Sequence, residues 1–158
     1  MNLLAERART IGVLLPQIAR NLRIASLVDR VRKGLTLAQL TILLILKDAR
    51  EQTMSMGEIA RELGVSFPTA SGLVDRLTRE GLATRLTSDS DRRVVLVQLT
   101  GNGKAVLRRM LRLLDDLLMR LLADMGEAEQ ESFVEAVDRV FGLSQLIRDE
   151  EKQTAAVS

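Results

Sequence analysis

The chain of 158 residues contains no cysteine, histidine, tyrosine or tryptophan. Without cysteine it can form no disulfide, and thiolate chemistry and cysteine-based oxidant sensing are excluded. Without histidine it lacks the usual general base and the commonest transition-metal ligand. The aromatic residues are Phe67, Phe133 and Phe141, too few for a stacking platform that binds single-stranded nucleic acid. We therefore expect no catalytic site, no cofactor and no metal site.

Long uninterrupted apolar runs are also lacking. Glu6, Arg7 and Arg9 interrupt the N-terminal apolar stretch, which is not typical of a signal peptide. The most apolar run, Leu37 to Leu46, is shorter than the roughly 20 residues that cross a bilayer. The apolar content of 46% and charged content of 28% are ordinary for a soluble globular protein. We expect a cytoplasmic protein without membrane contact.

The net charge is only +2, but the charges are unevenly distributed. Residues 1–50 hold nine basic and three acidic residues, a balance of +6. Residues 126–158 hold three basic and eight acidic residues, a balance of −5. Residues 51–100 have six basic and seven acidic residues, or −1. Nucleic acid would therefore be bound through placed contacts rather than through a general basic field.

The two ends of the chain are predicted to be helical. Apolar residues at three- and four-residue steps predict a helix from Leu3 to about Val31, in which Pro16 indicates a kink or a late start. Thr36 is a good N-cap for a second helix, Leu37 to about Asp48. Two further helices are expected after Gly101, to about Met125 and from about Glu127 to Arg148, followed by a frayed tail.

The middle of the chain predicts two short helices followed by a hairpin. Ser55 and Glu58 have capping-box spacing, and Gly64 ends the helix that they begin. Ser66 caps the next helix, in which Pro68 is tolerated because it lies in the first turn. The segments "LATRL" (82–86) and "VVLVQL" (94–99) read as strands on either side of the turn-rich loop "TSDSDRR".

Two short helices joined by "LGVS" have the spacing of a helix-turn-helix. The second helix of such a pair enters the major groove by its N-terminal residues. Here these residues are Ser66, Phe67, Pro68, Thr69, Ala70, Ser71 and Gly72. Hydroxyl groups bond phosphates or base edges, apolar atoms meet a thymine methyl, and a helix N-terminus suits a phosphate. A cap followed by a solvated helix face would also explain the same residues.

The loop of the hairpin carries Asp89, Asp91, Arg92 and Arg93. Arginine at a loop tip can enter the narrow, electronegative minor groove of DNA. Alternatively, the four opposite charges pair with one another in a solvated turn that contributes almost nothing to stability. The residue pattern alone leaves both interpretations open.

Residues 57–103 resemble the winged helix-turn-helix of the multiple antibiotic resistance regulator (MarR) family. The resemblance is carried by "LVDRL" and "EGL" and by the wing signature, in which Asp91 and Arg93 precede a strand that ends in Leu99 and Thr100. The fold implied is mainly α with a small β-hairpin wing: a winged helix-turn-helix plus a helical dimerisation region. We expect an N-terminal dimerisation helix in 1–34, the DNA-binding domain in 35–100, C-terminal dimerisation helices in 101–150, and a flexible tail in 151–158.

The resemblance implies a homodimeric transcription regulator, usually a repressor, that binds a pseudo-palindromic operator on double-stranded DNA. A small ligand, often anionic and aromatic, would release it. The implied recognition-helix contacts are Ser66, Phe67, Thr69, Ser71, Gly72 and Arg76. Arg93 would be the minor-groove arginine, and Arg92 beside it could contact phosphate. Asp91 would orient Arg93, and also Arg76, rather than contact the DNA.

The terminal helices carry more apolar surface than one wing domain can cover, which favours a shared two-fold bundle over an intramolecular core. In the family the ligand often lies between these helices and the wing domain, where Arg20 or Arg23 could meet an anion. For either arginine alone, a solvated helix face is the better explanation. A protein–protein adaptor that uses the fold without DNA remains the alternative function, because the middle region is nearly neutral.

Overall fold

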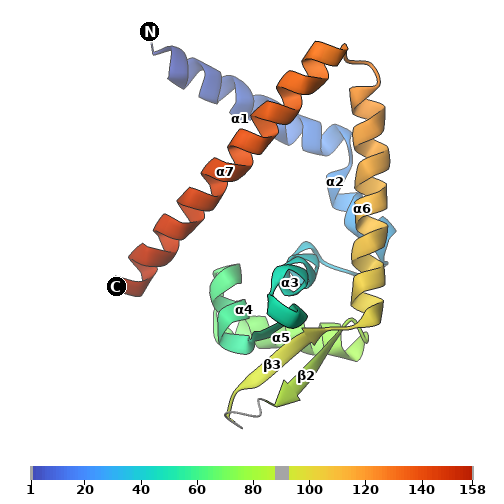
Figure 1. Cartoon of the computed structure of the whole chain (residues 1–158), viewed down its shortest axis with the longest axis vertical. Coiled ribbons are helices and arrows are strands. Elements are labelled where there is room, and N and C mark those ends of the chain that lie inside the picture. Colours follow the sequence, from blue (N-terminus) through green and yellow to red (C-terminus); the bar gives the residue numbers. More distant parts are fainter. Residues whose placement is uncertain (1, 88–92, 158) are drawn as a thin grey trace. The chain divides into compact units, whose positions relative to one another are not determined.

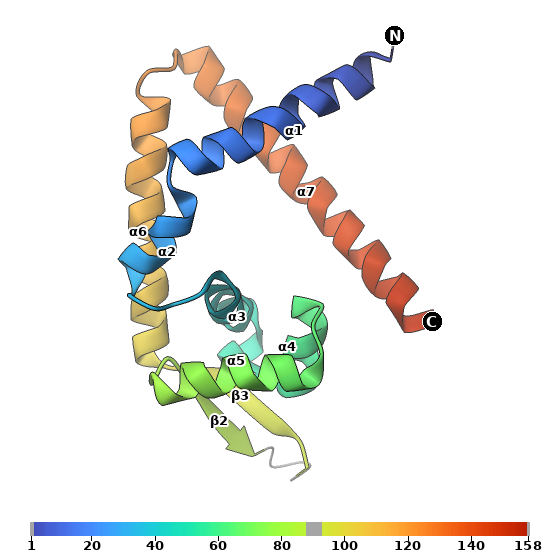
Figure 2. The ribbon, with the colours of Figure 1, turned by 180° about the vertical axis from the view of Figure 1, so that it is seen from behind.

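In the computed structural model, residues 2–87 and 93–157 are described, and they form a mainly helical chain with a small antiparallel sheet (Figures 1 and 2). The elements in chain order are α1 (Leu3–Asn21), α2 (Ile24–Val31), α3 (Leu37–Asp48), the 3-10 turn η1 (Arg50–Gln52), β1 (Thr53–Ser55), α4 (Met56–Leu63), α5 (Phe67–Arg79), β2 (Ala83–Thr87), β3 (Val95–Leu99), α6 (Gly101–Leu122) and α7 (Glu127–Val157). The chain divides into two compact units, residues 1–114 and 115–158.

The core of the first unit lies among α3, α4, α5 and the sheet. Fully buried side chains come from each of these elements, including Ile42, Leu46, Ile59, Leu77 and Val97. The predicted helix from Leu37 to Asp48 is confirmed. It begins at a capping box in which the Thr36 side chain accepts a hydrogen bond from the Gln39 backbone N–H. Because α3 is apolar on most sides, it can bury residues against several neighbours at once.

The sheet has three strands, in the order β1-β3-β2, whereas the sequence predicted a two-stranded hairpin. The additional strand, β1, pairs with β3 so that Met54 lies opposite Val97. On the other side of β3, Arg85 of β2 lies opposite the same valine. At three residues, β1 is too short to show the alternation from which a strand is recognised in a sequence. In both views the β2–β3 hairpin extends away from α3, α4 and α5 (Figures 1 and 2).

The predicted N-terminal helix is two helices, and its break is not at Pro16. This proline lies inside α1, and the chain turns at Leu22 and Arg23, where Arg23 adopts a left-handed backbone conformation with φ of 51°. Pro16 removes one backbone donor, but α1 has no buried residue, so solvent can satisfy the carbonyl that loses its partner.

The segment Leu3–Val31 is long and apolar enough to cross a membrane by length and composition alone. The core helix of a soluble protein and an N-terminal signal sequence pass the same test, and this segment is broken between α1 and α2. Its apolar side chains are exposed in the single chain, including Ile11, Leu14, Leu15 and Ile18.

In the second unit, the last part of α6 turns into α7. The Gln130 side-chain amide donates hydrogen bonds of 3.0 Å to the carbonyl oxygens of Leu122 and Met125. Helix α7 continues to Val157, whereas the sequence predicted that the last helix ends near Arg148. The segment "DEEKQTAAV" contains neither glycine nor proline and is rich in residues with good helix propensity, which accounts for the longer helix.

Candidate nucleic-acid interface

The turn between α4 and α5 fixes the direction of α5. Helix α4 starts at the predicted capping box, where Ser55 and Glu58 exchange hydrogen bonds, and ends at Gly64, with φ of 64°. The amide N–H of Val65 donates to the Ala60 carbonyl oxygen at 3.1 Å, which closes the turn. These bonds satisfy donors and acceptors that the helix ends would otherwise leave unpaired. The helix-turn-helix predicted from "LGVS" is confirmed in its geometry.

The capping box also lowers the pKa of the Glu58 carboxyl. The main cause is the hydrogen bond from the Ser55 hydroxyl, followed by the bond from the Ser55 backbone N–H; burial opposes both, and nearby Arg61 adds to the lowering. Each of these hydrogen bonds favours the ionised carboxylate. The box is therefore strongest when Glu58 is charged.

The start of α5 presents an open surface. Ser66 caps the helix, and its hydroxyl lies 2.8 Å from the Thr69 hydroxyl. Phe67 is 56% exposed although it is a large apolar side chain. The predicted site residues that are exposed on this helix are Ser66, Phe67, Pro68, Thr69, Gly72 and Arg76. Ala70, next to them, is fully buried, as are Val74 and Leu77, so these three residues anchor the helix while its first turn remains exposed.

Ser71 is half-buried because it contacts the wing. The Arg85 guanidinium, on β2, donates a hydrogen bond of 3.0 Å to the Ser71 hydroxyl. The same guanidinium forms an ion pair with Asp75 at 3.0 Å. We call this three-residue cluster the Arg85 brace. It ties the first strand of the wing to the exposed side of α5. Its members lie in different elements, so no local pattern in the sequence predicts the cluster.

Arg76 pairs with Glu80 one helical turn away, at 3.8 Å. Glu80 also accepts from Arg32, which follows α2, at 3.3 Å. The expected partner of Arg76 and Arg93 was Asp91, which lies outside the described residues together with Arg92. Arg93 is exposed and precedes β3 by two residues. The two ion pairs of Glu80 link the C-terminal end of α5 to Arg32, in the segment after α2.

The base of the wing is held by Thr100. Its hydroxyl donates to the Gly81 carbonyl oxygen at 2.8 Å and accepts from the Gly103 N–H at 3.1 Å. Gly103 approaches the chain so closely that a Cβ there would overlap the Leu82 carbonyl oxygen. The Leu-Thr that ends the wing signature therefore joins the end of α5, the sheet and the start of α6.

The two arginines suggested for ligand binding lie in different settings. Arg20 lines a cavity of about 600 Å³ together with Ala19, Ile24, Val28, Leu35, Thr36 and Leu37. Arg23 is not among the lining residues, and its exposed side chain belongs to the break between α1 and α2. The structure thus separates two residues that the sequence could not distinguish. Within residues 2–87 and 93–157, no group of three or more acidic residues could hold a metal ion.

Comparison with known proteins places this architecture among transcription regulators. The MarR family model, MarR_2, matches residues 33–94. An uncharacterized HTH-type transcriptional regulator of Bacillus subtilis, YfiV, is 31% identical over 107 residues, which cover 68% of this chain and 66% of that protein. The Bacillus subtilis repressor YetL is 28% identical over 117 residues, 74% of this chain and 70% of the relative.

Solved structures agree with the sequence relatives. The crystal structure of RV1404 from Mycobacterium tuberculosis matches with a TM-score of 0.74 and 26% identity, over 85% of this chain and 92% of that one. The relatives are regulators rather than enzymes. The helix-turn-helix, the wing closed by Thr100 and these similarities lead to one conclusion: the chain belongs to the MarR family of winged helix-turn-helix transcriptional regulators.

Proposed function

We propose that the protein is a homodimeric, cytoplasmic repressor that binds a pseudo-palindromic operator on double-stranded DNA. The observation that carries this proposal is the exposed side of α5, presented by the helix-turn-helix and joined to the wing by the Arg85 brace. The relative YetL is a transcriptional repressor, which supports repression rather than activation as the role proposed here.

The N-terminal part of α5 supplies the base-reading groups. The hydroxyls of Ser66 and Thr69 accept and donate hydrogen bonds, and exposed Phe67 offers an apolar contact for a thymine methyl. A Cβ at Gly72 would meet no atom within 4 Å, so this position leaves room for close approach of DNA. Pro68 and Ser71 complete the surface, and Arg76 adds a cation beyond it.

The wing supplies the minor-groove contact. Arg93 is exposed beside the hairpin loop, and we assign it to the minor groove, with Arg92 on a neighbouring phosphate and Asp91 orienting Arg93. Wings of two copies would lie on either side of the paired recognition helices. Two recognition helices related by a two-fold axis fit successive major grooves when they lie about 34 Å apart.

The dimer is proposed from the apolar surface of the terminal helices. In α1, Ile11, Leu14, Leu15 and Ile18 are each about half exposed or more. In α7, the exposed apolar side chains include Phe133, Val137, Val140 and Phe141. So many exposed apolar residues are unusual on a monomer and indicate an interface. We propose that residues 1–34 and 101–150 form a helical dimerisation region with a second copy.

The effector is proposed to bind in the cavity beside Arg20. Its remaining lining residues are apolar except for Thr36, which suits an organic anion with an apolar or aromatic body. The cavity touches α1, α2 and the start of α3, and Arg32, directly after α2, pairs with Glu80, the C-cap residue of α5. A ligand there could therefore change the position of the recognition helix and release the DNA.

Fluorescence anisotropy with the promoter fragment next to the protein's own gene tests the DNA contacts. Arg93 is proposed to bring one positive charge close to the DNA phosphates, which releases condensed counterions. Arg93→Ala should therefore weaken binding and lower the slope of log affinity against log salt by about one. Arg139→Ala, which removes the same charge from an exposed position on α7, is the control and should leave both quantities unchanged. The proposal fails if the wild-type protein binds no fragment specifically at low salt.

A further inference from the structure

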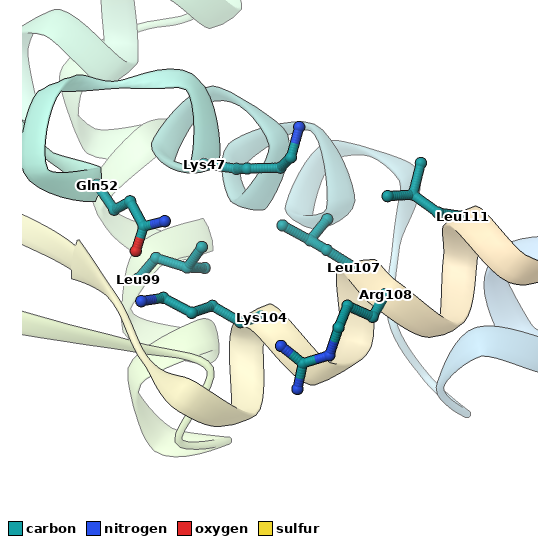
Figure 3. Close-up of a pocket in the computed structure, with 7 residues that line it drawn as sticks. All are labelled: Lys47, Gln52, Leu99, Lys104, Leu107, Arg108 and Leu111. Carbon is teal, nitrogen blue, oxygen red and sulfur yellow. The ribbon is translucent and has the colours of Figure 1, made fainter.

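A second cavity, of about 190 Å³, lies in the first unit and shares no lining residue with the cavity beside Arg20 (Figure 3). It is bordered by the end of α3, the turn η1, the end of β3 and the first half of α6. Its lining residues are Lys47, Gln52, Leu99, Lys104, Leu107, Arg108 and Leu111. None of them belongs to the proposed DNA-binding surface.

The lining combines an apolar floor with a cationic rim. Leu99 and Leu107 are 4% and 3% exposed, so the floor is part of the core, while Leu111 extends it outward. Three positive charges surround the cavity, from Lys47, Lys104 and Arg108. Among the described residues that line it, none is acidic. Lys47 pairs with Asp48 at 3.2 Å, but the Asp48 carboxylate is 75% exposed and lies outside the lining.

Figure 3 shows the Lys104 side chain extending toward Gln52, whereas Lys47 and Arg108 point outward from the rim. Gln52 offers both a donor and an acceptor, and its backbone is held in a left-handed conformation with φ of 56°. Glu51 before it has φ of 53°. Two successive left-handed residues that are not glycine are strained, and such strain concentrates at ligand sites. The Gln52 side chain lines the cavity beside this turn.

We propose that this cavity binds a small organic carboxylate with a compact apolar body. The body lies on Leu99 and Leu107, and the carboxylate accepts hydrogen bonds from Lys104 and from the Gln52 amide. Charge-assisted bonds of this kind are stronger than neutral ones. A bare inorganic anion would use the rim but leave the leucine floor uncovered, so the floor selects for the apolar body. This site is separate from the cavity proposed for the effector and goes beyond the proposed function.

Isothermal titration calorimetry of the full chain tests the proposal, with cyclohexanecarboxylate as the probe. A ligand of this size is expected to bind with a dissociation constant on the order of 1 mM. Lys104→Gln should weaken binding about ten-fold, because it removes one charge-assisted hydrogen bond. Arg109→Gln is the matched control: it removes the same charge from the same helix at an exposed residue outside the lining, and should leave the affinity unchanged.

Cyclohexanecarboxamide, which lacks the charge, and inorganic phosphate, which lacks the apolar body, should both bind more weakly than the carboxylate. Equal binding of either compound would overturn the proposed ligand class, and an absence of heat with the wild-type protein would overturn the site. If Arg20→Gln lowers the affinity and Lys104→Gln does not, the probe occupies the other cavity and the proposal is wrong. Should Lys104→Gln not fold by circular dichroism, Gln52→Asn replaces it; asparagine tolerates the left-handed backbone, and its shorter side chain withdraws the amide from the carboxylate, so binding should again weaken.

Discussion

The Arg85 brace provides a quantitative test of how the wing is attached to the recognition helix. Arg85 contacts both Asp75 and Ser71 at 3.0 Å, but its side chain is 35% exposed and that of Asp75 is 54% exposed. Solvent screens such a pair, and exposed ion pairs typically contribute about 0.2–1 kcal/mol. We therefore expect a coupling energy between Arg85 and Asp75 within this range rather than the several kcal/mol of a buried network.

A double-mutant cycle with Arg85→Gln, Asp75→Asn and the double variant measures this coupling by urea denaturation. All variants are compared at the same protein concentration, because association changes the apparent stability. The cycle is repeated with Arg9→Gln in place of Arg85→Gln; Arg9 is an exposed arginine on α1 and should show no coupling to Asp75.

The coupling should also decrease at high salt, because the pair is exposed to solvent. A coupling energy indistinguishable from that of the Arg9 control would show that the brace does not form in solution. A coupling of about 3 kcal/mol or more, unaffected by salt, would show that the pair is far more buried than the structure indicates.

Three further predictions concern other parts of the chain. Gly103→Ala should lower the free energy of unfolding by about 1–3 kcal/mol in urea denaturation, because the new Cβ overlaps the Leu82 carbonyl oxygen, whereas Gly101→Ala, with open space around it, should not. Folding lowers the pKa of Glu58, so the contribution of this carboxylate to stability is present above its ordinary pKa and is lost as the pH falls through the folded-state pKa. Glu58→Gln should remove that part of the acid dependence when thermal unfolding is followed from pH 7 to pH 3. Phe141→Asp places a charge on the proposed apolar interface and should shift the mass measured by light scattering from dimer to monomer, a shift that Arg139→Ala should not produce.

The sequence predicted the elements whose ends carry a local chemical signal. Thr36 and Ser55 were recognised as caps because their side chains bond to backbone groups three residues away, and Gly64 because glycine tolerates a left-handed conformation. The exposed residues at the start of α5 followed from the same reasoning, since Ser66 fixes where the helix begins. Such signals depend only on residues close together in the chain.

Features that depend on distant contacts were missed or misplaced. Strand β1 exists because β3 offers it a partner more than 40 residues later, and its three residues show no pattern of their own. The N-terminal break was expected at the proline but lies at Arg23, whose side chain gives no sign of a left-handed backbone. The Arg85 brace joins residues from a strand and a helix, so only the fold brings them together.

Selection of bound fragments from random double-stranded DNA tests the central claim most directly. If two copies present α5 to successive major grooves, the wild-type protein should enrich one pseudo-palindromic sequence whose half-sites are centred about 10 base pairs apart. The same selection with Arg93→Ala should yield the motif more weakly and with less preference in the segments that flank the half-sites. Enrichment of no motif at low salt, or of a single unpaired half-site, would contradict a sequence-specific dimeric regulator.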